Sequence, residues 1–417
     1  MTDKVKVLQV VESCAAGVGR HVSGLCEDLI AQGHQVTVAY APYHADAAFE
    51  KFIMVHRNEI DFVPIKLRHE ISPVSDLAGL FQLLRLIWHK GPFDVVHGHS
   101  SKGGAIARLA GRLSGLPTVY TPHGLNMASP RVARAKLAAN ALVERILGYG
   151  ATSKIISVSE GEREFIRKLK LTPKQRICLI NNGVDVRDLD YFSKHRVAGG
   201  TIDEKPLTFG SVMRFSPPKT PGHLVEAFDR LCAAMPYLPM RLSIAGDGEL
   251  LTGVRRQVRE RGLNEKVSLL GWRMDINKLM LGFDVFVLSS LSEGGSYTVL
   301  EAMAAGLPVV STKVFGAEES IAQVPGNVLV PAGDPEMLAS GMRRIANLVV
   351  GRSPRRALEQ IGQANRDYIR SHFTQSDTTR RTLEVYRELR STQKKEHSYL
   401  ALARSWETST KHHRSTS

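Results

Sequence analysis

The chain has 417 residues, of which 43% are hydrophobic and 23% charged, a size and balance that predict a globular protein with two hydrophobic cores. Its apolar runs fall short of the roughly 20 residues that cross a bilayer, and its first segment lacks the apolar core of a secretory signal, so we expect a cytoplasmic protein. The formal net charge of +14 suits anionic lipid surfaces, phosphorylated substrates or nucleic acid, and does not choose among them.

Short apolar, β-branched runs alternate with segments of helical period along the first half of the chain. This alternation is typical of a parallel sheet covered by helices, so residues 1–190 are predicted to form a Rossmann-like α/β domain. The strands expected in this half are residues 5–11, 35–40, 94–97, 118–120 and 155–158.

The same rhythm restarts after residues 191–205, a segment with two consecutive glycines and mixed charges that is predicted to be a linker. A second Rossmann-like domain is therefore expected over residues 206–370. A helix over residues 371–395 is predicted to pack back toward the first domain, and residues 396–417 to form a basic, disordered tail. The strands expected in the second domain are residues 207–212, 241–245, 266–270, 285–288 and 309–311.

An internal repeat links the two halves. A strand that begins Phe-Asp-Val at residue 93 precedes a helix, a Gly-Leu-Pro turn and another strand, and the same order recurs from residue 283. One such match is common, because Gly often ends a helix and Pro often precedes a buried strand. Two matches in the same order indicate two related domains.

The strongest functional signal is the segment of residues 292–308, Ser-Glu-Gly-Gly-Ser-Tyr-Thr-Val-Leu-Glu-Ala-Met-Ala-Ala-Gly-Leu-Pro. A Gly-rich turn that opens a helix at the carboxyl end of a strand presents N–H groups to a phosphate. Glu293 would grip a sugar hydroxyl there, and Glu301, about two helical turns further on, would reach ribose hydroxyls. Each carboxylate alone is also compatible with a solvated helix, but the two together favour a binding site.

This E-x7-E arrangement resembles the signature of the family 4 retaining glycosyltransferases of the GT-B fold, and the resemblance extends to about Lys395. It implies two Rossmann-like domains facing across a cleft, with the acceptor on the N-terminal side and a nucleotide-sugar donor on the C-terminal side. The implied enzyme is a hexosyltransferase that retains anomeric configuration without a metal. The donor-binding residues implied in this segment are Glu293, Gly294, Gly295, Ser296, Tyr297, Thr298 and Glu301, with Glu293 also catalytic.

Two further segments of the second domain match the family pattern. Arg214 and Lys219 resemble an R-x4-K element that holds the donor diphosphate, and both are expected to act in catalysis. A departing diphosphate gathers negative charge, which two fixed cations stabilise without a metal. Without the two carboxylates nearby, they would be interpreted as surface cations. The nucleotide base is expected near Gly271, Trp272 and Arg273.

The first domain contributes a glycine loop and histidines. Gly17 and Gly19 resemble the loop that approaches the donor phosphates, although a plain turn between strand and helix has the same composition. The resemblance places His123, in a Thr-Pro-His-Gly segment, near the donor sugar as a catalytic residue. His97 and His99 are interpreted as structural or acceptor-side residues.

No cofactor and no metal are expected. The four cysteines lack C-x-x-C spacing, so neither a disulfide framework nor a zinc site is predicted. Asp188 and Asp190 satisfy a D-x-D metal-binding pattern, but they lie beside the linker and are interpreted as surface residues. No carboxylate on the acceptor side can be named as a nucleophile. The predicted reaction is therefore attack on the face that the leaving group departs from, with the departing phosphate helping to deprotonate the acceptor.

The expected partners are a nucleotide-sugar donor and a glycan or polyprenyl-linked acceptor, in bacterial exopolysaccharide or lipopolysaccharide assembly. Basic stretches at residues 131–145 and 163–176 favour contact with the inner face of an anionic membrane, but solvated helix faces explain them nearly as well. Nucleic acid is not expected, because no aromatic-rich basic motif occurs. The alternatives are a nucleotide-sugar epimerase and a non-catalytic basic binding protein.

Overall fold

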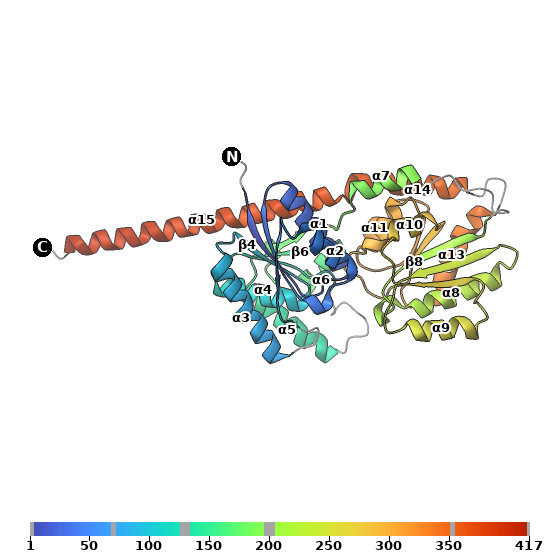
Figure 1. Cartoon of the computed structure of the whole chain (residues 1–417), viewed down its shortest axis with the longest axis horizontal. Helices are drawn as coiled ribbons and strands as arrows, with labels where there is room; N and C mark the ends of the chain where they lie inside the picture. Colours follow the sequence, from blue (N-terminus) through green and yellow to red (C-terminus); the bar gives the residue numbers. More distant parts are fainter. Residues whose placement is uncertain (1–3, 68–71, 126–133, 196–204, 351–354, 415–417) are drawn as a thin grey trace.

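The computed structural model describes residues 4–67, 72–125, 134–195, 205–350 and 355–414. The chain forms two α/β domains side by side, and its long last helix runs along the first of them (Figure 1). Each domain is built on one parallel sheet with helices on its faces. This arrangement confirms the predicted pair of Rossmann-like domains. Among the described residues, no helix is long and apolar enough to span a membrane.

The first sheet has seven strands in the order β3-β2-β1-β4-β5-β6-β7. Its central strands are largely buried, as expected for parallel strands covered on both faces, and one of them, Val95–His99, buries two histidines. The strands are β1 Lys6–Val11, β2 Gln35–Tyr40, β3 Asp61–Pro64, β4 Val95–His99, β5 Thr118–Thr121, β6 Lys154–Ser157 and β7 Ile177–Leu179. The helices are α1 Ala16–Ala31, α2 Ala47–His56, α3 Pro73–Lys90, α4 Ser101–Leu113, α5 Arg134–Gly150 and α6 Glu160–Lys168.

The second sheet has six strands in the order β10-β9-β8-β11-β12-β13. The strands are β8 Leu207–Val212, β9 Met240–Ala245, β10 Val267–Gly271, β11 Val285–Leu288, β12 Val309–Thr312 and β13 Val328–Val330. The helices are α8 Pro221–Ala234, α9 Leu251–Glu260, α10 Ile276–Leu281, α11 Tyr297–Ala304, α12 Ala317–Ile321, α13 Pro335–Ala346 and α14 Arg356–His372.

Three strands of the structure were not predicted: β3, β7 and β13. They have three or four residues each, and all three lie at the edge of a sheet. A run of that length shows no hydrophobic period of its own, and at a sheet edge each of these strands pairs with one neighbour among the described residues.

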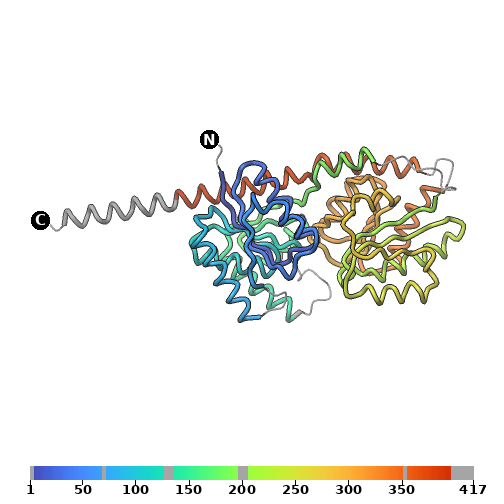
Figure 2. The backbone as a smooth tube through the Cα atoms, in the orientation of Figure 1, coloured from blue at the N-terminus to red at the C-terminus, as the bar shows by residue number. Residues whose placement is uncertain are grey.

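The chain passes between the domains at two places that lie side by side (Figure 2). Val184 and Thr374 form an isolated parallel bridge, and a Cβ atom on Gly183 would lie only 2.2 Å from the carbonyl oxygen of Thr374. The first passage lies ahead of the linker predicted over residues 191–205. The helix α7, Val186–His195, already buries Leu189 and Phe192 in the core of the second domain.

The C-terminal helix α15, Gln375–Arg414, returns along the first domain and contacts α1 and β4. Thr379 donates a hydrogen bond to Asp28 of α1, and Arg390 donates to the carbonyl oxygen of Lys4. The structure continues this helix into the residues for which a disordered tail is predicted, 396–417. The reason is local, since no Gly or Pro occurs between Gln375 and Arg414 to end it.

Candidate active site

The carboxyl ends of the two sheets meet between the domains. His123 follows β5 of the first domain, and Glu293 lies in the loop between β11 and α11 of the second. The backbones touch here, because a Cβ atom on Gly294 would lie 2.3 Å from the amide nitrogen of Gly124. Only glycine allows such an approach. We call the residues that meet here the junction; they are residues 17–21 and 123–124 of the first domain and residues 293–298 and 301 of the second.

Polar contacts close the space at the junction. The Asn182 side chain donates to the carbonyl oxygen of Gly295 at 2.9 Å. The Glu319 carboxylate of the second domain accepts hydrogen bonds from the amides of residues 160 and 161, at 2.6 and 2.7 Å. These amides open α6 of the first domain, where a carboxylate is favourable. A small pocket remains between the domains, and its lining includes Val158, Asn182, Gly295, Ser296 and Glu319.

Lys219 and Glu293 form the central ion pair of the second domain. The ammonium nitrogen of Lys219 lies 2.6 Å from both carboxylate oxygens of Glu293, and the Ser290 hydroxyl donates to one of them, also at 2.6 Å. The Glu293 side chain is nearly buried, at 8% exposed. A buried carboxylate needs such partners, because an unpaired charge is costly away from water. The structure thus brings together one residue from each of the two sequence patterns of this domain.

Arg214 lies on the same loop, between β8 and the short turn that carries Lys219. Its side chain is exposed, and it forms no ion pair with the residues that the structure describes. The structure therefore brings Lys219 to Glu293 but does not bring Arg214 to either of them.

Glu301 is held by a residue that the sequence analysis missed. Arg20 Nε of α1 lies 2.8 Å from Glu301 Oε1, and another nitrogen of the guanidinium lies 2.6 Å from Asp188 of α7. Burial raises the pKa of Glu301, while Arg20 lowers it; in turn Glu301 raises the pKa of Arg20. The position of Arg20, one turn into a helix that follows a glycine loop, could have marked it as a candidate. Nothing in the sequence indicated that its partner would be Glu301 of the other domain.

The glycine loop of the first domain lies against the first turn of α11. A Cβ atom on Gly17 would lie 3.5 Å from the Tyr297 ring, and one on Gly19 would lie 3.0 Å from the carbonyl oxygen of Cys14. The Tyr297 hydroxyl lies 3.2 Å from Nδ1 of His21. In this structure the glycines make room for protein atoms. Next to Tyr297, the hydroxyls of Ser296 and Thr298 are hydrogen-bonded at 3.1 Å.

The segment expected near the nucleotide base lies at the edge of the second sheet. Gly271 ends β10 with a positive φ of 67°, Trp272 is 44% exposed, and Arg273 is paired with Asp275 at 2.6 Å. Strands β9 and β8 separate β10 from β11. These three residues thus lie at the same carboxyl edge of the sheet as Lys219, but at its end, away from the ion pair.

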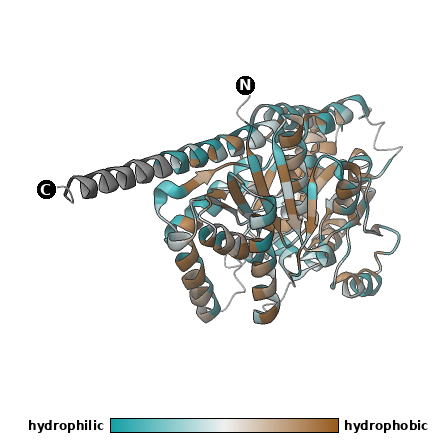
Figure 3. Cartoon of the chain, turned by 60° about the vertical axis from the view of Figure 1, so that its left-hand side comes forward, coloured by the Kyte–Doolittle hydropathy of each residue, from teal (hydrophilic) through white to brown (hydrophobic). Residues whose placement is uncertain are grey.

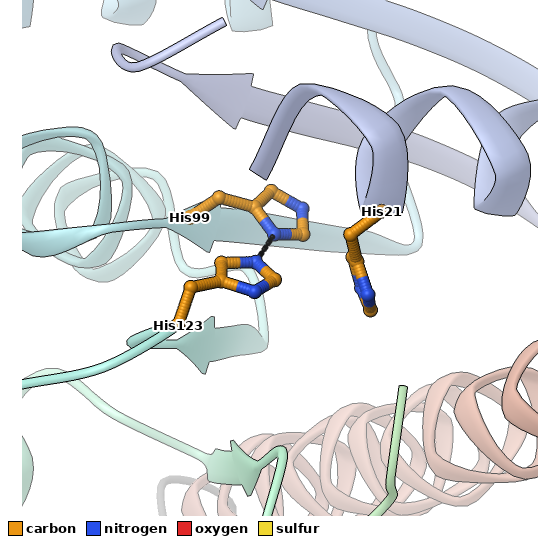
Figure 4. A group of neighbouring side chains, drawn as sticks. All are labelled: His21, His99 and His123. Atoms are coloured by element: carbon orange, nitrogen blue, oxygen red, sulfur yellow. Dashed lines mark hydrogen bonds between the residues drawn. The ribbon is translucent and has the colours of Figure 1, made fainter. Parts of the chain in front are cut away.

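Four histidines gather at the carboxyl edge of the first sheet, and three of them are drawn in Figure 4. His99 Nδ1 lies 3.0 Å from His123 Nε2, and the ring of His21 lies 4.6 Å from that of His123. Burial lowers the pKa of His21 to about 4 and holds those of His97, His99 and His123 well below their usual range. The group is therefore neutral at pH 7. His123 itself has a φ of +57°, a strained conformation for a residue with a side chain.

His21, His99 and His123 each bring a potential metal-ligand nitrogen within 4.8 Å of the others. By residue type the group suits a transition metal. However, the facing nitrogens of His99 and His123 share one proton in a hydrogen bond, which already satisfies both. The arrangement fits a hydrogen-bonded pair better than a set of ligands.

Glu162 supports the segment that carries His123. Its carboxylate accepts hydrogen bonds from the amides of Gly124, at 2.8 Å, and Val158, at 2.9 Å. Burial raises the pKa of Glu162 to about 7, and these two hydrogen bonds lower it. The sequence analysis did not single out Glu162, because a Glu in the first turn of a helix is common there.

Both halves of the chain match known sequence families. Residues 15–188 match the model described as Glycosyltransferase Family 4, and residues 195–365 match the one described as Glycosyl transferases group 1. The chain is 31% identical to the UDP-Gal:alpha-D-GlcNAc-diphosphoundecaprenol alpha-1,3-galactosyltransferase of Escherichia coli over 295 residues, 69% of this chain and 74% of that protein. It is 28% identical to the putative glycosyltransferase EpsF of Bacillus subtilis over 284 residues, 66% of this chain and 71% of that protein.

The fold is also similar to that of solved structures. The structure of HepE from Anabaena in complex with UDP-glucose matches with a TM-score of 0.73 and 20% sequence identity, over 92% of this chain and 99% of that one. At this identity the match shows the two-domain fold.

Proposed function

Because this chain belongs to the family 4 glycosyltransferases, we propose that it is a retaining, metal-independent hexosyltransferase that acts on a nucleotide sugar. Glycosyltransferase activity follows from the family, which both family models and the relative with 31% identity establish. The acceptor we propose is a glycan or a lipid-linked sugar of a surface polysaccharide. The E. coli relative, whose name states a diphosphoundecaprenol-linked acceptor, supports this choice.

The contact between Lys219 and Glu293 carries the proposal. It places one cation and one carboxylate beside the backbone amides of Gly294 and Gly295, close to His123 of the other domain. In the proposed complex the diphosphate takes Lys219 as its partner, and sugar hydroxyls take Glu293. The ammonium group then stabilises the charge that develops on the departing diphosphate.

Donor binding has to replace protein contacts at the junction. Arg20 occupies the carboxylate of Glu301 that we assign to the ribose hydroxyls. When the donor binds, two ribose hydroxyls would donate hydrogen bonds to this carboxylate in place of Arg20. The guanidinium would then be free to move toward the diphosphate. The ion pair therefore acts as a placeholder that keeps a buried carboxylate neutralised before the donor arrives.

The reaction we propose is attack on the same face of the sugar from which the diphosphate departs. The departing phosphate accepts the acceptor's proton, and Arg214 and Lys219 supply the positive charge. Analysis of the anomeric configuration of the product tests this step, and inversion would overturn it. Transfer should also persist in the presence of a metal chelator, and its loss would contradict metal independence.

We propose a UDP-linked donor, which the UDP-Gal in the name of the E. coli relative and the UDP-glucose held by HepE support. Purified protein should melt at a higher temperature with UDP than with GDP or ADP, because a ligand that binds only the folded state stabilises it. Lys219→Ala should remove the shift, and Lys266→Ala, an exposed residue ahead of β10, should keep it. A larger shift with another nucleotide would reassign the base. Isomerised sugar without acceptor would favour an epimerase.

A membrane contact through the first domain is supported more strongly by exposed apolar residues than by the predicted basic stretches. On α3, Phe81 is 70% exposed and Trp88 is 81% exposed, and α5 also exposes Leu142 and Ile146. Figure 3 shows hydrophobic stretches on the helices at the bottom of the view, where α3 and α5 lie in Figure 1. Large aromatic side chains next to basic residues suit an interfacial position.

The basic stretches contribute less than their composition suggests. Arg163 and Arg167 are paired with Glu160 and Glu164 on the same helix, and residues 131–133 lie outside the described residues. We expect the wild type to sediment with vesicles that contain anionic lipid at low salt. The double variant Phe81→Ser, Trp88→Ser should bind them less, whereas Tyr237→Ser, an exposed aromatic of the second domain, should not. Equal sedimentation of all three proteins would contradict the contact.

A further inference from the structure

We propose that Tyr386, on the C-terminal helix α15, is a positioning residue that fixes the protonation of His123 through Gln9 and His99. The proposal rests on the proposed function, in which His123 contacts the donor sugar. Tyr386 belongs to neither sheet, and no motif in the sequence singles it out.

These four side chains form one hydrogen-bonded chain inside the first domain. Gln9 is on β1, and its Nε2 lies 3.1 Å from the Tyr386 hydroxyl. Gln9 Oε1 lies 2.8 Å from Nε2 of His99, at the end of β4. His99 Nδ1 lies 3.0 Å from Nε2 of His123. The side chains of Gln9, His99 and Tyr386 are fully buried. The chain leads from α15 to the junction.

The Gln9 amide sets the direction of the hydrogen bonds between Tyr386 and His97. Its Nδ1 lies 2.6 Å from the Tyr386 hydroxyl, and its Nε2 lies 2.8 Å from the Thr121 hydroxyl. The Tyr386 oxygen accepts the hydrogen bond of the Gln9 amide, so its single proton is donated to His97 Nδ1. Neutral His97 therefore keeps its own proton on Nε2 and donates it to Thr121.

The same reasoning determines which nitrogen is protonated in His99 and in His123. Gln9 Oε1 can only accept a hydrogen bond, so His99 holds its proton on Nε2. His99 then has a lone pair on Nδ1, which accepts the Nε2 proton of His123. As a result, His123 is left with an unprotonated Nδ1.

This pattern requires neutral imidazoles, and the low pKa values of these histidines meet that requirement. Burial, together with the neighbouring rings of the group, lowers the pKa of His97, His99 and His123. A neutral imidazole has one donor and one acceptor, so reversing a single bond of the chain would leave two buried donors or two buried acceptors facing each other.

The fixed pattern has a consequence for donor recognition. An unprotonated Nδ1 accepts a hydrogen bond, so His123 favours a sugar that presents a hydroxyl to it over one that presents a carbonyl or a carboxylate. Tyr386 would influence this preference without contacting the sugar.

Tyr386→Phe separates the hydroxyl from the packing of the ring. The Tyr386 ring lies edge-on against the ring of His97, with centroids 5.7 Å apart, and phenylalanine keeps that contact. Without the hydroxyl, the Gln9 amide has no fixed orientation. His99 and His123 can then adopt the reversed pattern, with a proton on His123 Nδ1.

Nitrogen-15 NMR of the full-length, histidine-labelled protein tests the chain directly, because it distinguishes a proton on Nδ1 from one on Nε2. The His123 signal is identified by its loss in His123→Gln. We expect Nε2 protonation at His97, His99 and His123 in the wild type, and a second protonation form of His123 in Tyr386→Phe. Protonation of Nδ1 at His99 or His123 in the wild type would overturn the proposal, whether or not Tyr386→Phe folds.

Kinetics provide the second readout. For Tyr386→Phe we expect kcat to fall roughly 3- to 10-fold, the range for losing one neutral hydrogen bond, with the donor KM changed less than kcat. The matched control is Tyr368→Phe on α14, whose ring stacks on His372 away from this chain and which should change neither value. An unchanged kcat with a single His123 form in Tyr386→Phe would overturn the proposal.

The two proposals fail in different ways. If the wild type shows the expected protonation pattern but transfers no sugar, the proposed function fails and the positioning of His123 stands. If the wild type transfers sugar but Tyr386→Phe leaves His123 unchanged, the positioning role fails and the proposed function stands.

Discussion

In and beside the junction, the second domain presents an ion pair, whereas the first domain presents, besides the cation of Arg20, a group of neutral imidazoles that contact one another. Lys219 and Glu293 belong to the first kind, and His99 and His123 to the second. A diphosphate gathers charge as it leaves and is stabilised by fixed cations, while a sugar hydroxyl can donate to a carboxylate or to the unprotonated nitrogen of a neutral imidazole. The cation of the second domain therefore suits the diphosphate, and the imidazoles of the first domain suit a sugar hydroxyl.

The strongest way to break this contrast is to remove the cation. We expect Lys219→Ala to lower kcat at least about 100-fold, the scale of losing one electrostatic contact to a developing charge. It also leaves Glu293 buried without its ion pair, so the melting temperature should fall. Steady-state kinetics and thermal melting measure the two effects, with Lys266→Ala as the control. A kcat within tenfold of the wild type would mean that Lys219 does not face the diphosphate.

Removing the carboxylate assigned to the ribose should weaken binding more than turnover. We expect Glu301→Ala to raise the donor KM roughly 10- to 100-fold, the scale of losing hydrogen bonds to a charged group. The smaller change in kcat follows because the ribose lies away from the bond that breaks. Glu265→Ala, at an exposed position ahead of β10, is the matched control. A fall in kcat without a change in KM would place Glu301 at the reacting sugar instead.

Glu162, which supports the segment that carries His123, has a carboxyl group whose charge depends on pH near neutrality. Burial raises the pKa of its carboxyl from 4.5 to about 7, so its stabilising contribution is complete below about pH 4.5 and is lost as pH rises through about 7. Relative to the wild type, Glu162→Gln should gain about 2 kcal/mol of unfolding free energy between pH 5.5 and pH 8. Denaturant unfolding at both pH values measures this. A difference between the two proteins that does not vary with pH would contradict the raised pKa.

The smallest effect should come from the edge of the second sheet. If the nucleotide base stacks on Trp272, which is 44% exposed, Trp272→Ala should raise the donor KM roughly 3- to 10-fold, the scale of one aromatic contact. Its kcat should stay near that of the wild type. Exposed Tyr237 offers a control, since Tyr237→Ala removes an aromatic ring that no motif places near the donor. Equal KM values for both variants and the wild type would move the base elsewhere.

Local sequence patterns predicted the parts of the fold that repeat. The central strands of both sheets are rich in apolar and β-branched residues and alternate with helices, so their positions agree with prediction to within a few residues. The short strands β3 and β13 show no such pattern and are defined by a single neighbour. The residues around Glu293 were recognised because a Gly-rich turn between strand and helix is a local feature. Their roles in catalysis stay predictions.

The contacts that organise the site could not be predicted in the same way. Arg20 meets Glu301, and Tyr386 meets Gln9, across intervals of hundreds of residues. Nothing near Arg20 in the chain states which carboxylate it will neutralise. His99 was interpreted as structural or acceptor-side, and its bond to His123 depends on the order in which β4 and β5 lie in the sheet.

By itself, the sequence determined the two α/β domains, the strand ends at which polar residues gather, and the resemblance to sugar-transferring enzymes. These properties depend on hydrophobic period and on residues close together in the chain. The tertiary structure alone decided which of these residues meet. It paired Arg20 with Glu301 across the junction and brought the Tyr386 hydroxyl into contact with His97. Buried charges and hydrogen-bond donors need partners, and only the folded chain determines which partners lie within reach.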